Sequence, residues 1–209
     1  AILMVLKNYI RKSKAICFEG NNYSDEWKAE AKARGLNNFA NTPEALDVLG
    51  TKLAKDFYSK SKVMSPLELE AYHAVQLHNY VTKLSIEVST LTEVVTSMVL
   101  PAVFRQQTEL AQNLTALKAV GLEDTAGYQK DALKAISKAI AAIQEGLHKI
   151  EKGLEKVHHA DGVREEAEIL CNKVKPQMEA VREAVDELEG LVDDQQWPLV
   201  KYREMLAVR

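Results

Sequence analysis

Large aliphatic residues recur at alternating steps of three and four between residues 133 and 157. This heptad spacing places their side chains on one face of an α-helix, as in the seam of a coiled coil. Burying one such side chain stabilises a protein by roughly 1.5–3 kcal/mol, so a face of this length needs packing partners. The residues of this seam are Leu133, Ile136, Ile140, Ile143, Leu147, Ile150, Leu154 and Val157.

Two further stretches keep the same rhythm and supply the partners. One begins at Leu77, passes through Val88 and Val95 and continues to Leu117; the other runs from Ala167 to Val192. We therefore expect long helices over about residues 66–118, 128–158 and 163–192. Because the connections between them are short, neighbouring helices should be antiparallel, in an up-down-up bundle.

Helix caps and prolines refine this prediction. Ser65 and Glu68 form a capping-box pattern with Pro66 at the first helical position, which is a strong signal for a helix start. Pro101 and Pro176 fall inside the first and third long helices. A proline inside a helix removes a backbone donor and crowds the preceding turn, so we expect a kink or local unwinding at both positions.

Shorter elements flank the long helices. Ser24 is the expected N-cap of one of them and Gly35 its terminator, while Thr42 and Pro43 start another. The fold class predicted is all-α, an antiparallel bundle of three long helices with shorter N-terminal helices and a short C-terminal helix. The short elements expected are a helix over residues 1–12, an extended segment over 14–18, and helices over 25–34, about 42–49, about 51–59 and about 199–206.

Composition narrows the functional classes. The 209 residues carry a formal net charge of −3 and no basic stripe, which argues against nucleic acid as a partner. The apolar opening at residues 1–6 is too short for a membrane span and lacks a secretory flank, so no membrane association is expected. Cys17 and Cys171 match no metal or redox spacing and are expected as reduced thiols in a cytoplasmic protein. The apolar, uncapped start predicts that the chain begins inside a larger one.

A search for reactive side chains yields no catalytic, cofactor-binding or metal-binding residue. Phosphate-binding glycine loops, nucleophile elbows and zinc motifs are missing from the sequence. His158 and His159 stand beside Asp161, but adjacent histidines diverge, and a solvated helix end is the favoured interpretation. The candidate interaction or anchoring residues are Trp27, Trp197 and Pro198; the alternative is that each tryptophan is partly buried in its own domain.

Two stretches near the ends resemble a known family. One is Gly20-Asn21-Asn22-Tyr23-Ser24-Asp25-Glu26-Trp27-Lys28-Ala29-Glu30-Ala31, followed by Arg34-Gly35-Leu36-Asn37-Asn38 and Thr42-Pro43-Glu44-Ala45-Leu46. The other is the ending Trp197-Pro198-Leu199-Val200-Lys201-Tyr202-Arg203-Glu204-Met205-Leu206. They are similar to the region after the catalytic core, and to the short C-terminal tail, of type III glutamine synthetases. The resemblance covers essentially the whole chain, and residues 20–31 are its most specific part.

This resemblance implies a parent enzyme that joins ammonia to glutamate, using ATP and magnesium or manganese ions, in a dodecamer. Residues 1–20 would be the C-terminal remnant of its catalytic domain and residues 21–209 its helical C-terminal domain. The catalytic motifs of the family lie upstream, so no catalytic residue can be transferred to this chain. The implied partners are the upstream catalytic domain and other subunits of a homo-oligomer.

The resulting hypothesis is a C-terminal fragment of a glutamate–ammonia ligase that is inactive alone and serves assembly or regulation of the parent enzyme. The alternative, from a different class, is a stand-alone helical adaptor that shares the family's tail.

Overall fold

The computed structural model describes residues 2–14, 17 and 19–206, and the chain divides into two compact units, Ala1–Val48 and Leu49–Arg209. Each unit is considered by itself. The regular elements of the described residues are all helical, which confirms the predicted all-α class. The predicted division at residue 20 stays a prediction, since neither unit ends there.

The first unit contains α1 (Ile2–Ser13), α2 (Asp25–Ala33) and α3 (Thr42–Asp47). The Ser24 hydroxyl accepts a hydrogen bond from the Trp27 backbone N–H at 3.4 Å and caps α2 as predicted. At the other end, Gly35 adopts φ +71°, and the Leu36 N–H donates to the Ala31 carbonyl at 2.8 Å. This is a Schellman terminus, which glycine favours because it has no Cβ to strain a left-handed conformation.

One sequence prediction in this unit needs correction, and another falls partly outside the described residues. The cap of α3 is Asn41, whose side-chain oxygen accepts from the Glu44 N–H at 2.9 Å, so the helix starts one residue earlier than its Thr42 cap predicted. Beyond Asp47 the chain tightens into the 3₁₀ turn η2 (Val48–Gly50). The predicted extended segment 14–18 includes residues 15, 16 and 18, which lie outside the described residues.

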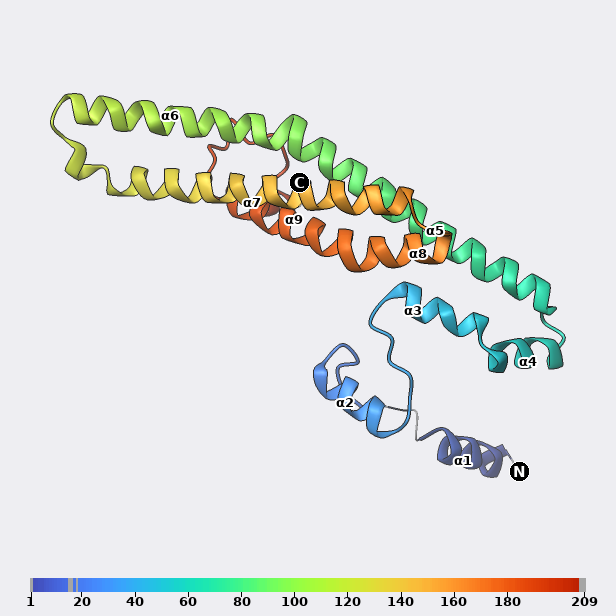
Figure 1. Cartoon of the computed structure of the whole chain (residues 1–209). Coiled ribbons are helices and arrows are strands. Elements are labelled where there is room, and N and C mark those ends of the chain that lie inside the picture. Colours follow the sequence, from blue (N-terminus) through green and yellow to red (C-terminus); the bar gives the residue numbers. More distant parts are fainter. Residues whose placement is uncertain (1, 15–16, 18, 207–209) are drawn as a thin grey trace. The chain divides into compact units, whose positions relative to one another are not determined.

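The second unit holds the three long helices (Figure 1). The first joins α5, η3 and α6, α7 returns alongside α6, and the third joins α8, η5 and α9, with α9 packed on α7 and α8 on α5. Their bounds are α5 (Pro66–Val94), η3 (Val95–Val99), α6 (Leu100–Ala119), α7 (Gly127–His158), α8 (Val163–Ile169), η5 (Leu170–Val174) and α9 (Lys175–Glu189).

The shorter elements of this unit are α4 (Lys52–Lys60), η4 (Glu123–Thr125) and α10 (Tyr202–Met205). The predicted capping box at Ser65 is confirmed, with the Glu68 N–H donating to the Ser65 hydroxyl and the Glu68 carboxylate accepting from the Ser65 N–H. The third long helix ends at Glu189 rather than at residue 192. The predicted C-terminal helix from residue 199 was wrong at its start, because residues 199–201 are not helical and α10 begins only at Tyr202.

Both internal prolines follow a π-helical turn. The Leu100 N–H bonds to the carbonyl of Val95, five residues back, directly before Pro101. The Lys175 N–H bonds in the same way to Leu170 before Pro176. A π turn holds one extra residue, which changes the hydrogen-bond register where the proline lacks a donor. The predicted disturbance at both prolines therefore takes the form of a π turn inside a continuous helix.

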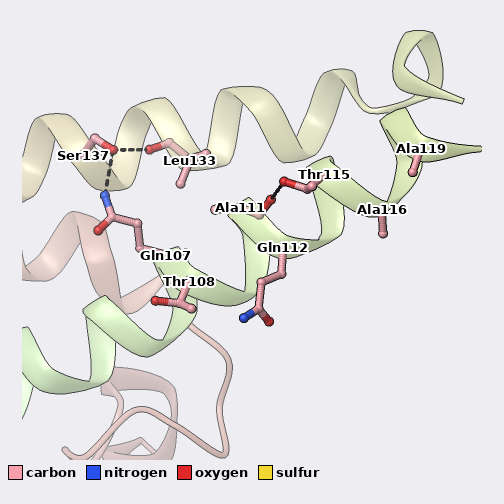
Figure 2. Close-up of a pocket in the computed structure, with 9 residues that line it drawn as sticks. All are labelled: Gln107, Thr108, Ala111, Gln112, Thr115, Ala116, Ala119, Leu133 and Ser137. Carbon is pink, nitrogen blue, oxygen red and sulfur yellow. Dashed lines mark hydrogen bonds between the residues drawn. The ribbon is translucent and has the colours of Figure 1, made fainter. Parts of the chain in front are cut away.

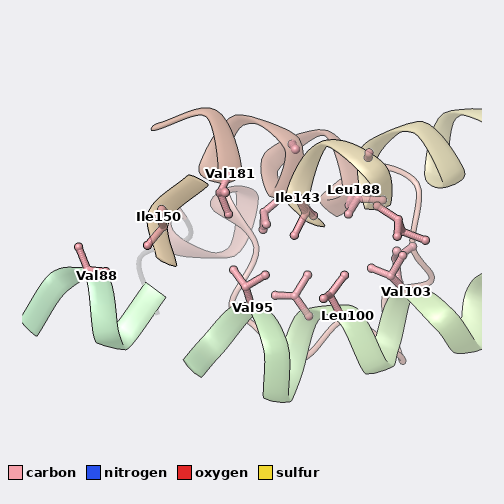
Figure 3. Packing of buried hydrophobic residues seen from close by; sticks show 14 of the residues in the cluster. Val88, Val95, Leu100, Val103, Ile143, Ile150, Val181 and Leu188 are labelled. Carbon is pink, nitrogen blue, oxygen red and sulfur yellow. The ribbon is translucent and has the colours of Figure 1, made fainter. Parts of the chain in front are cut away.

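The core lies where all three long helices meet (Figure 3). In Figure 3, Val95 and Leu100 of the first helix face Ile143 of α7, while Leu188 comes from α9. Within the predicted seam 133–157, Ile136 and Ile143 are fully buried and the remaining positions are buried or half-buried. The heptad pattern thus identified the packing face of α7 correctly.

A second row of buried residues on α7 has small side chains. Ala132, Ala139, Gly146 and Gly153 recur every seven residues and lie inside the bundle. A Cβ added at Gly153 would lie 2.6 Å from the Val174 Cγ2 atom, and a Cβ at Gly146 would overlap Val181. These contacts show that α7 and the third helix approach closely because glycine stands at the two points of contact.

Beyond the end of α9, α6 and α7 continue as a two-helix projection, which we call the hairpin tip (residues 107–137) (Figure 1). Of its seam residues, Ile136 at the base of the tip is buried, whereas Leu110, Leu114, Leu117 and Leu133 are only half-buried. Because the third helix stops at Glu189, the tip lacks the layer that completes the core elsewhere.

One described helix, Pro66–Ala119, is long and apolar enough to cross a membrane by length and composition, with an 18-residue window of mean hydropathy 1.4 of which 28% is buried. Core helices of bundles meet the same criterion. Val99, Ala102 and Val103 have no exposed surface and lie within the bundle, so packing accounts for these apolar residues.

Candidate functional site

The candidate anchoring residues Trp197 and Pro198 lie in the segment after α9, which we call the tail (residues 190–206). Trp197 is only 7% exposed and belongs to the core cluster, whereas Pro198 is exposed. The tail therefore inserts one large side chain into the core near the point where the third helix ends.

Lys201 closes the end of α9. Its side chain is almost completely buried, and its ammonium donates hydrogen bonds to the carbonyls of Glu189 at 2.8 Å and Val192 at 3.3 Å. The last carbonyls of a helix have no partner within the helix and carry a partial negative charge. A lysine from the tail thus neutralises this end and ties the tail to it.

Asp194 completes an ion cluster on the outside of this contact. Its carboxylate pairs with the Lys201 ammonium at 2.5 Å and with the Arg203 guanidinium. The hydrogen bond from Lys201, followed by that from Arg203, lowers the pKa of Asp194 below its ordinary value. The carboxylate is therefore held in its charged form, and it links the start of the tail to α10.

Two amide side chains fasten the tail to α6. The Gln106 side-chain oxygen accepts from the Asp193 N–H at 3.1 Å, and the Gln196 side-chain amide donates to the Glu109 carboxylate at 2.6 Å. Both bonds join residues 87 positions apart in the chain. Together with Trp197 and Lys201, they attach the tail to both the first and the third long helices. We call this set of tail contacts the clasp.

Trp27, the remaining sequence candidate, lies in α2 of the first unit. Its side chain is half-buried, so part of the indole remains accessible. The structure brings Trp197 and Pro198 together in the tail, while Trp27 belongs to a different unit. The anchoring roles of the three residues stay predictions.

Titratable side chains form no obvious reactive centre in the described part of the chain. No group of three or more histidine, cysteine, aspartate or glutamate side chains there could hold a metal ion. His148 is 62% exposed, with its Nδ1 atom 3.7 Å from the Glu151 carboxylate. Cys17 and Cys171 are free thiols. The pKa of Tyr80 is raised, mainly by burial of its hydroxyl and, as the second cause, by a hydrogen bond with Cys171.

Sequence reasoning missed Lys201 and Asp194 altogether. A lysine and an aspartate in a polar tail give no signal of burial, because the carbonyls that Lys201 binds become available only through the fold. The small-residue row on α7 did leave a signal, the seven-residue spacing of Ala132, Ala139, Gly146 and Gly153.

Comparisons with known proteins place the sequence in a family. Residues 1–118 match the family described as the glutamine synthetase C-terminal domain. The chain is 32% identical to a glutamine synthetase of Bacteroides fragilis (strain YCH46), over all of this chain and 29% of the relative. It is 30% identical to a type-3 glutamine synthetase of Dictyostelium discoideum, over 98% of this chain and 28% of the relative.

A glutamine synthetase of Butyrivibrio fibrisolvens is 25% identical over 97% of this chain and 29% of its own length. The chain thus spans less than a third of each of these curated relatives, and it corresponds to their C-terminal region. The resemblance predicted from residues 20–46 and 197–206 is confirmed. The chain belongs to the glutamine synthetase C-terminal domain family.

Proposed function

We propose that this chain is the non-catalytic helical part of a larger glutamine synthetase and that it contributes to assembly of the parent enzyme. The observation that carries the first part of this proposal, that the chain belongs to a larger enzyme, is the exposed apolar surface of α1. Ile2, Leu3, Met4 and Ile10 are 67–82% exposed. The helix carries Lys7, Arg11 and Lys12 on its other side, and the apolar face of such an amphipathic helix normally packs against protein, so we infer that further protein covers it.

The relatives supply a candidate for that cover. More than two thirds of their length lies outside the region that this chain matches. In the proposed arrangement α1 packs against the catalytic domain, and the bundle of the second unit contacts other subunits. The partners are therefore the upstream catalytic domain and further copies of the same subunit.

The chemistry of the parent enzyme belongs to residues outside this chain. We expect it to join ammonia to glutamate with ATP and magnesium or manganese ions. The described residues do not fit such a centre, because they offer no cluster of metal-binding side chains. The 209-residue chain alone should therefore form no glutamine from glutamate, ammonia and ATP, and turnover by the purified chain would contradict the proposal.

Assembly is tested in the full-length enzyme by deleting the region that corresponds to residues 66–206. Light scattering, with the particle mass divided by the mass of the shortened subunit, should then show fewer subunits per particle. A matched deletion of the hairpin tip alone keeps the core and the tail intact. An unchanged number of subunits per particle after the larger deletion would exclude the assembly role.

The same deletion, together with the natural reading frame, distinguishes assembly from two other roles, regulation and a free-standing adaptor. If the larger deletion leaves the number of subunits per particle unchanged but abolishes a response to glutamine or nucleotides, measured by calorimetry and activity, the bundle is regulatory. If the natural reading frame contains no catalytic domain before residue 1, the chain is a free-standing adaptor.

A further inference from the structure

A groove of about 720 Å³ lies in the second unit, between the C-terminal part of α7 and the first turns of the third long helix. One wall is a single face of α7, with residues three and four apart, namely Lys152, Glu155, Lys156 and His159. The other wall follows α8 and η5 and consists of Glu165, Ile169 and Lys173. Three lysine side chains from two helices therefore line one groove.

The close approach of the two walls has a structural cause. Gly153 has no side chain, and a Cβ added there would lie 2.6 Å from the Val174 Cγ2 atom. Lys152 and Lys173 are the chain neighbours of these two residues, so each helix places a lysine beside the contact. Lys173 also belongs to the π turn η5, a kind of turn that often occurs at functional sites. The fold thus brings like charges together at this point.

The lysines that line the groove have no carboxylate partner in the part of the chain that the structure describes. Neighbouring lysines on the same two helices do pair, Lys149 with Glu145 at 2.7 Å and Lys175 with Glu179 at 3.8 Å. The three without an ion pair among the described residues are Lys152, Lys156 and Lys173. The repulsion among their ammonium groups is therefore not compensated by these residues.

The two carboxylates of the lining do not remove this positive charge. The Glu165 carboxylate accepts a hydrogen bond from the Asp161 N–H at 2.7 Å and so belongs to the turn before α8. Glu155 lies at the edge, since it also lines the neighbouring groove between α5 and α7. The lysines outnumber both, although the whole chain has a net charge of −3. A groove lined by charges of one sign concentrates their field and attracts the opposite charge.

The groove on the hairpin tip provides a contrast (Figure 2). It is of similar size, about 750 Å³, but its lining contains no charged side chain; small and amide residues of α6 face Leu133 and Ser137 of α7. That lining selects no class of ligand. The lysine-lined groove does, because its three ammonium groups define the charge that it can bind.

We propose that the groove between α7 and the third long helix binds a phosphate group, held by Lys152, Lys156 and Lys173. A phosphate has more than one negative charge and at least three acceptor oxygens, so it can contact ammonium groups from both walls at once. A single carboxylate offers one charge and two oxygens. The buried Ile169 between the lysines gives an apolar contact for the organic part of a phosphate ester.

Isothermal titration calorimetry of the whole 209-residue chain with pyrophosphate tests this proposal. We expect one site per chain, and Lys152→Met or Lys173→Met should each raise the Kd by about ten-fold or more, because each removes a charge-assisted hydrogen bond. The control Lys175→Met removes a lysine two residues away, which pairs with Glu179 and does not line the groove, and it should change the Kd by less than about two-fold. Circular dichroism checks that all three variants fold.

Nuclear magnetic resonance of the ¹⁵N-labelled chain locates the site independently of any substitution. Pyrophosphate should shift amide signals of residues 152–159 and 165–173 and leave those of the hairpin tip unchanged. No binding at millimolar pyrophosphate, shifts confined to other residues, or equal weakening by Lys173→Met and Lys175→Met would each overturn the proposal.

Further titrations distinguish the sources of the phosphate group. Equal affinity for inorganic phosphate and AMP would support a site for free phosphate, whereas tighter binding of AMP would support an organic phosphate that contacts Ile169. Succinate bound as tightly as pyrophosphate would overturn the assignment to phosphate. The proposal goes beyond the assembly function and is separable from it, since binding is measured on this chain and assembly on the full-length particle.

Discussion

The middle of the bundle and the hairpin tip share one sequence pattern but differ in packing. In the middle, Ile143 of α7 has no exposed surface because α5–α6 and α9 cover it from two sides. At the tip, Leu114 and Leu133 continue the same heptad seams and remain half-buried. The hydrophobic pattern thus defines the face that packs, while the presence of a third helix decides how completely that face is buried.

The first test of this difference in packing is to truncate one seam residue in each region. Ile143→Ala removes a fully buried side chain and should reduce the free energy of unfolding by about 2–5 kcal/mol, through lost burial and the cavity left behind. Leu114→Ala at the tip should cost roughly half as much or less, because its site is already partly open to water. Urea denaturation measures both, and equal losses would show that the tip is as well packed as the middle.

The close contact between α7 and α9 gives the second test. Gly146→Leu would force a branched side chain against Val181 and should reduce the free energy of unfolding by about 1–3 kcal/mol. Ala135→Leu, at an exposed position of the tip, should change it by no more than about 0.5 kcal/mol. A fully tolerated Gly146→Leu would mean that the two helices can separate without loss.

The sequence predicted the long helices because caps and heptad spacing are local signals. The Ser65 capping box and the seam through Ile136 and Ile143 needed no tertiary information. The seven-residue spacing of Gly146 and Gly153 is visible in the sequence. From local propensity alone, however, a glycine inside a helix predicts only a loss of helix stability. Its benefit appears once Val181 and Val174 of the facing helix are in place.

The tail was predictable only in part. Trp197 marked the tail as a candidate for anchoring, but nothing in the sequence indicates that Lys201 is buried. Residues 199–201 were wrongly predicted as helix. Their non-helical path lets Leu199 pack on the core and brings the Lys201 ammonium to the end of α9. These contacts join distant parts of the chain, so local propensity could not reveal them.

The clasp at the boundary between middle and tip provides the third test. Lys201→Met keeps the buried aliphatic stem but leaves the Glu189 and Val192 carbonyls without their donor. We expect a loss of about 1–2 kcal/mol in the free energy of unfolding and faster proteolysis of residues 190–206. Lys130→Met at the tip also removes a lysine that donates to a carbonyl, that of Glu123, but at an exposed site, so its effect should be smaller.

The smallest effect concerns Asp194, whose carboxylate is solvent-exposed. Because Lys201 and Arg203 lower its folded pKa, its ionised form stabilises the folded chain above the unfolded pKa of about 3.9, and this contribution disappears as the pH falls through the folded pKa. Asp194→Asn should therefore lower the urea midpoint slightly at pH 7 and make no difference at a pH below the folded pKa. The control Asp124→Asn, at the tip, removes a carboxylate that makes no ion pair among the described residues and should not reproduce this pH dependence. If the difference between the chain and Asp194→Asn stayed constant from pH 7 to pH 3, the clasp would be held by packing of Trp197 and not by its ion cluster.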